Sequence, residues 1–317
     1  MAQFSPHELA IHLKDGLLSF PATAFGQDGE LDETAYRRHI EWQSSFGVAG
    51  LFAAGGTGEG FSLTPEENAK VTDWAVQSTR PEVPVLGSAS GSTKQAVRCA
   101  QAAEEAGAEG ILLLPPYLTE CDQDGLLEHA SAVCSSVDIG VIVYNRANAI
   151  YSAETIARLA ERHRNLIGFK DAVGNIEQLA RVTARNGDRL FYLGGLPTAE
   201  TYALPLLQMG VSTYSSALFN FAPEFALEFY ADVRNLDHSS VQEKLRNFVL
   251  PYLDIRDRGK GYGVSIIKAG LEIVGRGCGP VRPPLHDLRP HDFSDLEHLI
   301  QTSNVADVRT PQEGETR

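Results

Sequence analysis

The feature that most restricts the possible folds of this chain is a regular alternation of short apolar runs and helix-like segments. Eight apolar runs, each followed by a helix-like segment, recur roughly 28 residues apart. The runs are continuously apolar, which is typical of parallel strands that are covered on both faces. We expect these strands at residues 16–20, 49–53, 83–87, 110–114, 140–144, 166–170, 190–194 and 211–215. Eight consecutive units of this kind predict an α/β fold, a (β/α)8 TIM barrel.

An open, doubly wound sheet is the alternative for a chain that alternates strands and helices. Such a sheet binds dinucleotides at a G-x-G-x-x-G turn after its first strand. No such turn follows residues 16–20. The sequence therefore favours the closed barrel.

The strand pattern stops after residue 236. We expect a barrel with a short N-terminal lead-in at residues 1–236, and a helical extension packed on the barrel at 237–303. The extension should hold helices near 239–254, 263–274 and 292–301. Residues 304–317 are polar and charged, which predicts a disordered tail.

Composition excludes several classes of partner. The net charge of −14 and the lack of a basic run argue against nucleic acid. No apolar run approaches the ~20 residues that span a bilayer, and the N-terminus lacks the pattern of a signal peptide. We therefore expect a cytoplasmic protein. Its nine histidines and four cysteines show no metal-site spacing, so we expect neither a metal nor another cofactor.

In a barrel, chemistry takes place at the carboxyl ends of the strands, and Lys170 and Tyr144 occupy two neighbouring strand ends. Flanking apolar side chains would desolvate the lysine and favour its neutral, nucleophilic amine. A tyrosine nearby could then move protons. The alternatives remain open: Lys170 in a structural ion pair, for instance with Asp171, and Tyr144 as a packing residue.

The glycine-containing turn at residues 55–60 is a second candidate element. Its backbone N–H groups, with the hydroxyl of Thr57 beside Gly56, could hold a carboxylate, although a plain tight turn explains the glycines equally well. It is not a P-loop, because no Gly-Lys-Ser/Thr follows it. Further strand-end candidates for substrate binding are Gly194, Ser215 and Ser216.

Three motifs together resemble a known family. Gly-Gly-Thr-Gly-Glu at 55–59, Tyr-Asn at 144–145 and Gly-Phe-Lys-Asp at 168–171 look like those of the Schiff-base lyases of the dihydrodipicolinate synthase / N-acetylneuraminate lyase superfamily. The similarity covers residues from about 16 to 300. It implies a barrel, an imine on Lys170, proton transfer by Tyr144 and a homotetramer.

Within this superfamily the chain is most similar to enzymes that remove water and carbon dioxide from a keto-deoxy sugar diacid. It departs from the synthases at Gly56, where they carry threonine, and at Leu118, where they carry a tyrosine that relays protons across a subunit interface. Arg146 follows Tyr-Asn and could pair with the distal carboxylate of a diacid. The alternatives are an aldolase for 2-keto-3-deoxy sugar acids, a condensing synthase and, more remotely, a non-catalytic sugar-acid sensor.

Overall fold

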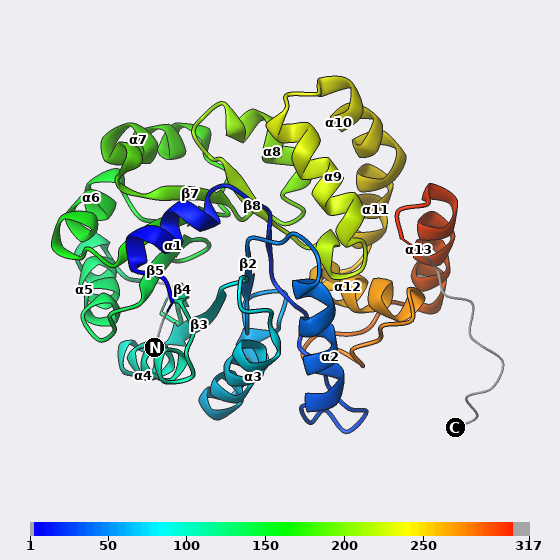
Figure 1. Ribbon diagram of the computed structural model, residues 1–317, viewed down its shortest axis with the longest axis horizontal. Helices are drawn as coiled ribbons and strands as arrows, with labels where there is room; N and C mark the ends of the chain where they lie inside the picture. The colour runs from blue at the N-terminus through cyan, green and yellow to red at the C-terminus, as the bar shows by residue number, and fades with distance from the viewer. Residues whose placement is uncertain (1–2, 119, 307–317) are drawn as a thin grey trace.

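The computed structural model describes residues 3–118 and 120–306, and within them eight parallel strands close into a barrel (Figure 1). Each strand pairs with the next along the chain, and β8 pairs with β1, with Leu18 opposite Ser215. The strands are β1 (Leu18–Ser19), β2 (Gly50–Phe52), β3 (Val85–Gly91), β4 (Gly110–Pro116), β5 (Gly140–Asn145), β6 (Leu166–Asp171), β7 (Phe191–Gly194) and β8 (Thr213–Ser216). The predicted (β/α)8 fold is therefore confirmed.

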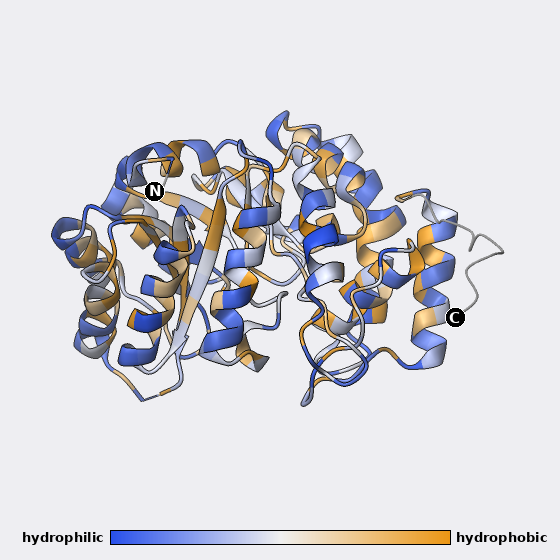
Figure 2. Ribbon diagram, turned by 60° about the horizontal axis from the view of Figure 1, so that its bottom comes forward, coloured by the Kyte–Doolittle hydropathy of each residue, from blue (hydrophilic) through white to orange (hydrophobic). Residues whose placement is uncertain are grey.

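Helices surround the strands. Figure 2 shows that they mix hydrophilic and hydrophobic residues, as expected of elements with one buried face. They are α2 (Glu33–Ser44), α3 (Pro65–Ser78), α4 (Thr93–Glu105), α5 (Gln123–Cys134), α6 (Ala153–Arg162), α7 (Ile176–Asn186), α8 (Glu200–Leu207) and α9 (Pro223–Arg234). Local sequence fixes where several of them begin. At α3, for example, Thr64 and Glu67 form a capping box around Pro65 at the first helical position.

The N-terminal lead-in forms helix α1 (Pro6–Leu13), which lies across the strands (Figure 1). Its Leu9 and Leu13 are fully buried in a cluster that also contains Ile142 and Ile167. The helix thus covers the end of the barrel opposite the carboxyl ends of the strands, and leaves the other end open for a site.

The chain after α9 forms helices that pack against one side of the barrel (Figure 1). They are α10 (His238–Lys244), the π-helical turn η4 (Leu245–Val249), α11 (Leu250–Arg256), α12 (Tyr262–Ile273) and α13 (Pro290–Ser303). The helix expected at 239–254 is thus interrupted by a π-helical turn. Leu51 of the barrel, Ile266 and Leu296 belong to one buried cluster, so this C-terminal segment shares a core with the barrel. Of the tail expected to be disordered, 307–317 lie outside the described residues.

Within the described ranges, no helix has both the length and the apolar character required to cross a membrane. The same residues contain no group of three or more histidine, cysteine or acidic side chains arranged for a metal ion.

Candidate active site

A cavity of about 600 Å³ opens at the carboxyl ends of the strands. Its walls come from strand ends and from the loops that follow them, and the C-terminal segment closes one side with Tyr252, Arg256 and Val264. The cavity contains seven of the eight predicted site residues: Gly56, Thr57, Tyr144, Arg146, Lys170, Ser215 and Ser216. Residues from four separate strand ends, those of β2, β5, β6 and β8, therefore meet at one site.

Lys170, the last residue but one of β6, is only 4% exposed. Its Nζ lies 3.6 Å from the centre of the Phe20 ring and 4.6 Å from that of Tyr144. No carboxylate of the described residues forms an ion pair with it, because Asp171 instead accepts hydrogen bonds from Asn145 Nδ2 and two backbone N–H groups. Burial, aided by the charge of Arg146, lowers the pKa of Lys170 well below its usual value. Both effects favour the neutral form of the amine, which is the form that can act as a nucleophile.

Tyr144 lies directly opposite Lys170 in the β5–β6 pairing. Its hydroxyl donates to the Gly195 carbonyl at 3.2 Å and accepts a hydrogen bond from Arg146 Nη1 at 3.4 Å. Burial raises the pKa of this phenol, against the opposing effect of Arg146. Tyr144 is thus a protonated phenol beside the amine, where it can pass a proton between substrate and solvent.

The turn after β2 is packed tightly on its inner side. A Cβ on Gly55 would lie 2.3 Å from the Phe20 ring, and one on Gly60 would lie 2.0 Å from the Ala54 carbonyl oxygen. Gly56 and Thr57 face the cavity, and no hydrogen bond within the described residues uses their backbone N–H groups. These two donors are free to receive an anionic group such as a carboxylate.

The two serines at the end of β8 differ. Ser215 lines the cavity and is half-buried. The Ser216 hydroxyl donates to Glu200 Oε1 at 2.5 Å and accepts from the Phe219 N–H at 3.2 Å, so its bonding capacity is largely used within the protein. Ser215 is the serine that is free for substrate.

The structure contradicts the prediction that Gly194 lines the site. A Cβ on Gly194 would point at the Tyr214 side chain, 3.2 Å away, on the outer face of the barrel. It is Gly195 that faces inward, where a Cβ would lie 2.4 Å from Lys170 Cε. Successive residues of a strand point to opposite faces, so an error of one position moves a residue from the cavity to the helix layer. Only a glycine at 195 leaves room for the lysine side chain.

Sequence reasoning also missed Glu200 and Arg256. Glu200 begins α8, is 1% exposed, and has one carboxylate oxygen without a hydrogen-bond partner. Its burial raises its pKa to about 7. Arg256, from the C-terminal segment, reaches the cavity and donates to Thr198 Oγ1 at 2.7 Å. Neither lies near a strand end in the sequence, so no local pattern pointed to them.

Comparison with known proteins shows the family to which the chain belongs. The model of the dihydrodipicolinate synthetase family matches residues 13–303. The chain belongs to this family. The predicted membership, which was inferred from the motifs at 55–59, 144–145 and 168–171, is therefore confirmed.

Within the dihydrodipicolinate synthetase family, two bacterial relatives are similar over nearly the whole chain. A Corynebacterium glutamicum protein is 70% identical over 313 residues, with 99% of each chain covered. An Arthrobacter protein is 66% identical over 302 residues, covering 95% of this chain and 99% of the relative. Both carry the name "Probable 5-dehydro-4-deoxyglucarate dehydratase".

Among solved structures, the dihydrodipicolinate synthase of Oceanobacillus iheyensis superimposes with a TM-score of 0.87. The alignment covers 94% of this chain and 99% of that one, at 23% sequence identity. At this identity the likeness establishes the fold, and it agrees with the closed barrel described above.

Proposed function

We propose that this protein is a lyase that converts 5-dehydro-4-deoxyglucarate into 2,5-dioxopentanoate, carbon dioxide and water through an imine on Lys170. The observation that carries the proposal is the buried Lys170 amine, which lines the cavity, has a pKa lowered by burial, and forms no ion pair with a carboxylate of the described residues. The names of relatives at 70% and 66% identity support the choice of substrate. No cofactor is needed, because the protonated imine itself serves as the electron sink.

The first step is imine formation. The Lys170 nitrogen attacks the ketone carbon, and the ketone oxygen leaves as water after accepting protons. Tyr144 would supply and recover these protons, since its hydroxyl and the amine flank the same point of the cavity. The positive charge of Arg146 favours the neutral amine needed for the attack.

Dehydration and decarboxylation follow on the imine. Loss of a proton from the carbon next to the imine gives an enamine, whose electrons expel the hydroxyl one carbon further as water. The bond to the distal carboxylate then breaks, carbon dioxide leaves, and its electron pair flows through the conjugated system to the iminium nitrogen. Reprotonation gives the aldehyde, and hydrolysis of the imine consumes the water that its formation released, restores the ketone and frees Lys170.

Two groups would hold the two ends of the diacid. The free N–H groups of Gly56 and Thr57 suit the carboxylate next to the ketone. Arg146 lines the cavity and is exposed there, and its guanidinium would pair with the second carboxylate. A diacid is thus a better match for the site than a monoacid.

Product identification with 5-dehydro-4-deoxyglucarate tests the proposal. We expect carbon dioxide and 2,5-dioxopentanoate without pyruvate, and borohydride should trap the substrate carbon skeleton on Lys170. Pyruvate as a product would instead identify an aldolase that uses the same lysine. Binding without any turnover would identify a sugar-acid sensor and overturn the proposal.

We further propose a homotetramer that works in the cytoplasm. The family resemblance supports the tetramer. Tyr117 and Leu118, at 90% and 56% exposed, are large apolar side chains after β4 that a second subunit could cover. Sedimentation equilibrium of the purified protein would give the subunit number.

A further inference from the structure

Three segments that are distant in the sequence meet behind the glycine-containing turn. They are the loop after β1, the turn at 55–60 itself, and the stretch that follows α12. The Phe25 N–H donates to the Cys278 carbonyl at 3.0 Å, and the Phe25 ring lies between two cations, 4.3 Å from Lys268 Nζ and 4.2 Å from Arg282 Cζ. We call this contact region the seam.

Glu59 is the centre of the seam. Its side chain is fully buried, and its backbone has a φ of 54°, in the left-handed region. Its carboxylate forms an ion pair with Lys268 Nζ at 2.8 Å and accepts the Arg282 N–H at 2.9 Å. Both of these partners belong to the C-terminal segment, so a residue of the turn is tied to a part of the chain more than 200 positions away.

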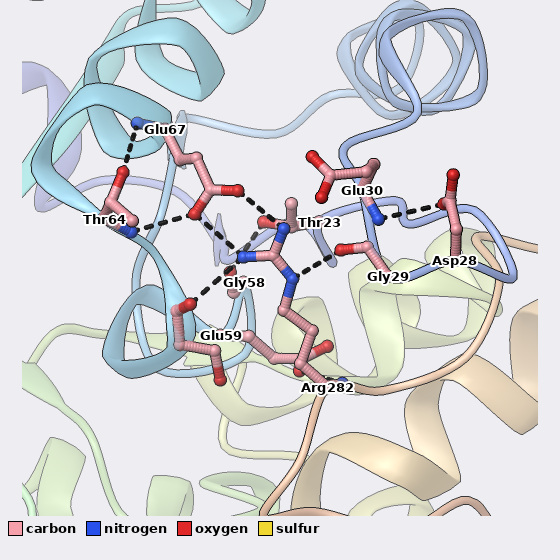
Figure 3. A network of polar contacts seen from close by, with 10 residues as sticks. Thr23, Asp28, Gly29, Glu30, Gly58, Glu59, Thr64, Glu67 and Arg282 are labelled. Atoms are coloured by element: carbon pink, nitrogen blue, oxygen red, sulfur yellow. Dashed lines mark hydrogen bonds and ion pairs between the residues drawn. The ribbon is translucent and has the colours of Figure 1, made fainter.

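The Arg282 side chain connects the C-terminal segment to the loop after β1 and to helix α3 (Figure 3). Its guanidinium forms a two-point contact with the Glu67 carboxylate, at 2.8 and 2.6 Å, and its Nε donates to the Gly29 carbonyl at 2.7 Å. Beside it, Thr23 Oγ1 donates to the Gly58 carbonyl at 2.6 Å. Gly58, Glu59 and Ser62 are thus bonded to the β1 loop or to Arg282, while Gly56 and Thr57 line the cavity and their N–H groups have no hydrogen-bond partner among the described residues.

We propose that Glu59 is a positioning residue for substrate binding: through Lys268 and Arg282, the C-terminal segment holds the turn in the shape that presents two free N–H groups to the carboxylate of an α-keto acid. The inference rests on the proposed function for the class of ligand. Its physical basis is that donors fixed before binding need not be ordered when the ligand arrives. The C-terminal segment then positions the substrate-binding turn in addition to lining the cavity.

Pyruvate, the smallest α-keto acid, is the probe. Lys268→Met removes the cation paired with Glu59 and should weaken pyruvate binding, measured by calorimetry, by about tenfold or more, because the donors lose their fixed places. With the full substrate, KM should rise by a similar factor while kcat at saturation changes less. A general loss of structure would lower both, and circular dichroism would reveal it.

A second variant covers the case in which Lys268→Met does not fold. Arg282→Met keeps the buried ion pair and removes only the outer anchor, so it should fold and still raise KM, by a smaller factor. The matched control is Lys244→Met. Lys244 also belongs to the C-terminal segment, and its replacement breaks the ion pair with Asp232 of α9 at 2.6 Å, far along the chain from the turn, so pyruvate binding should stay unchanged.

The outcomes separate the two proposals. Unchanged pyruvate affinity in folded Lys268→Met and Arg282→Met would overturn the positioning role, as would a wild-type protein that does not bind pyruvate at all. An equal rise of KM in Lys244→Met would assign the effect to general loosening of the segment, and would also overturn it. If wild-type protein binds pyruvate but borohydride traps no adduct on Lys170, the imine mechanism fails while the role of Glu59 can still be measured.

Discussion

Lys170, at the end of β6, and Lys268, in α12, are each 4% exposed, but of the two only Lys268 forms an ion pair with a carboxylate of the described residues. The acidic side chains repeat this contrast. Glu59 in the seam is paired with Lys268, whereas Glu200 forms no ion pair within the described residues and accepts a hydrogen bond from the Ser216 hydroxyl. The seam thus buries charges in pairs, and the strand ends bury ionisable groups without a counter-charge.

This difference explains what each region does. Burial lowers the pKa of both lysines, but at Lys268 the Glu59 carboxylate opposes the change, whereas at Lys170 the neighbouring Arg146 adds to it. A buried lysine beside a carboxylate is held as one half of an ion pair, whereas burial without a counter-charge favours the neutral amine that the proposed mechanism needs. Burial alone therefore does not make a nucleophile; the sign of the neighbouring charge decides.

The largest effect is expected from Lys170→Met. Turnover should fall by at least about 10⁴-fold, because no imine can form. Stability at neutral pH should rise, since the folded protein no longer has to bury an amine that the unfolded chain would protonate. In the wild type, the free-energy cost of burying Lys170 grows as the pH falls from the usual lysine pKa towards the lowered pKa of the folded state. The stability gained by Lys170→Met should therefore be smaller at alkaline pH. Kinetics and thermal melts at two pH values check both points, and wild-type turnover would contradict the assignment.

Tyr144→Phe removes the proton-transfer group while keeping the ring against Lys170. We expect kcat to fall by about 10²–10⁴-fold with substrate binding retained. Steady-state kinetics and calorimetry provide the measurement. An unchanged kcat would reassign Tyr144 to packing.

Lys268→Met tests the role of the buried ion pair between Lys268 and Glu59. It leaves Glu59 buried without a cation, which should destabilise the fold by roughly 3–5 kcal/mol. The double variant Glu59→Gln with Lys268→Met leaves no unpaired charge and should recover most of that loss. Denaturant unfolding of the three proteins checks this, and equal stability of Lys268→Met and wild type would show that the pair is not needed for folding.

Glu200→Gln concerns the unpaired carboxyl. Its pKa is raised to about 7, so the folded state holds the proton more tightly than the unfolded chain, and stability is lost as the pH rises from the usual value through 7. At pH 8 the substitution should therefore stabilise the protein, by up to about 3 kcal/mol, and near pH 4.5 it should change little. Unfolding curves of both proteins at the two pH values measure this difference. An equal increase in stability at pH 8 and pH 4.5 would contradict the assignment of the effect to Glu200 ionisation.

Arg146→Ala should have the smallest effect. The loss of its charge raises the pKa of Lys170, so the acid limb of the kcat/KM profile should move to higher pH. KM for the diacid should rise by about tenfold as one charged contact is lost. A KM that stays at the wild-type value would assign the distal carboxylate to another group, for which Arg256 is the next candidate.

Much of the fold and part of the site follow from local sequence. Continuous apolar runs mark parallel strands, and the repeat of strand and helix leaves a closed barrel as the favoured arrangement. Lys170 and Tyr144 could be predicted as neighbours because they end consecutive strands, and the structure pairs them in register. The choice between Gly194 and Gly195 could not be made, because it depends on a strand boundary that the apolar pattern does not fix to one residue.

The sequence by itself determined the barrel, the edge at which the site lies and the lysine on it, since these depend on periodicity and chain order. Only the tertiary structure decided which charges are paired. Glu59 and its partner Lys268 are more than 200 residues apart, and nothing in a glycine-containing turn says which distant cation will reach it. The physical reason is that pairing within a buried region depends on distance and exposure in three dimensions. The tertiary structure places a carboxylate 2.8 Å from Lys268, whereas it places Arg146 where its charge adds to the effect of burial in lowering the pKa of Lys170.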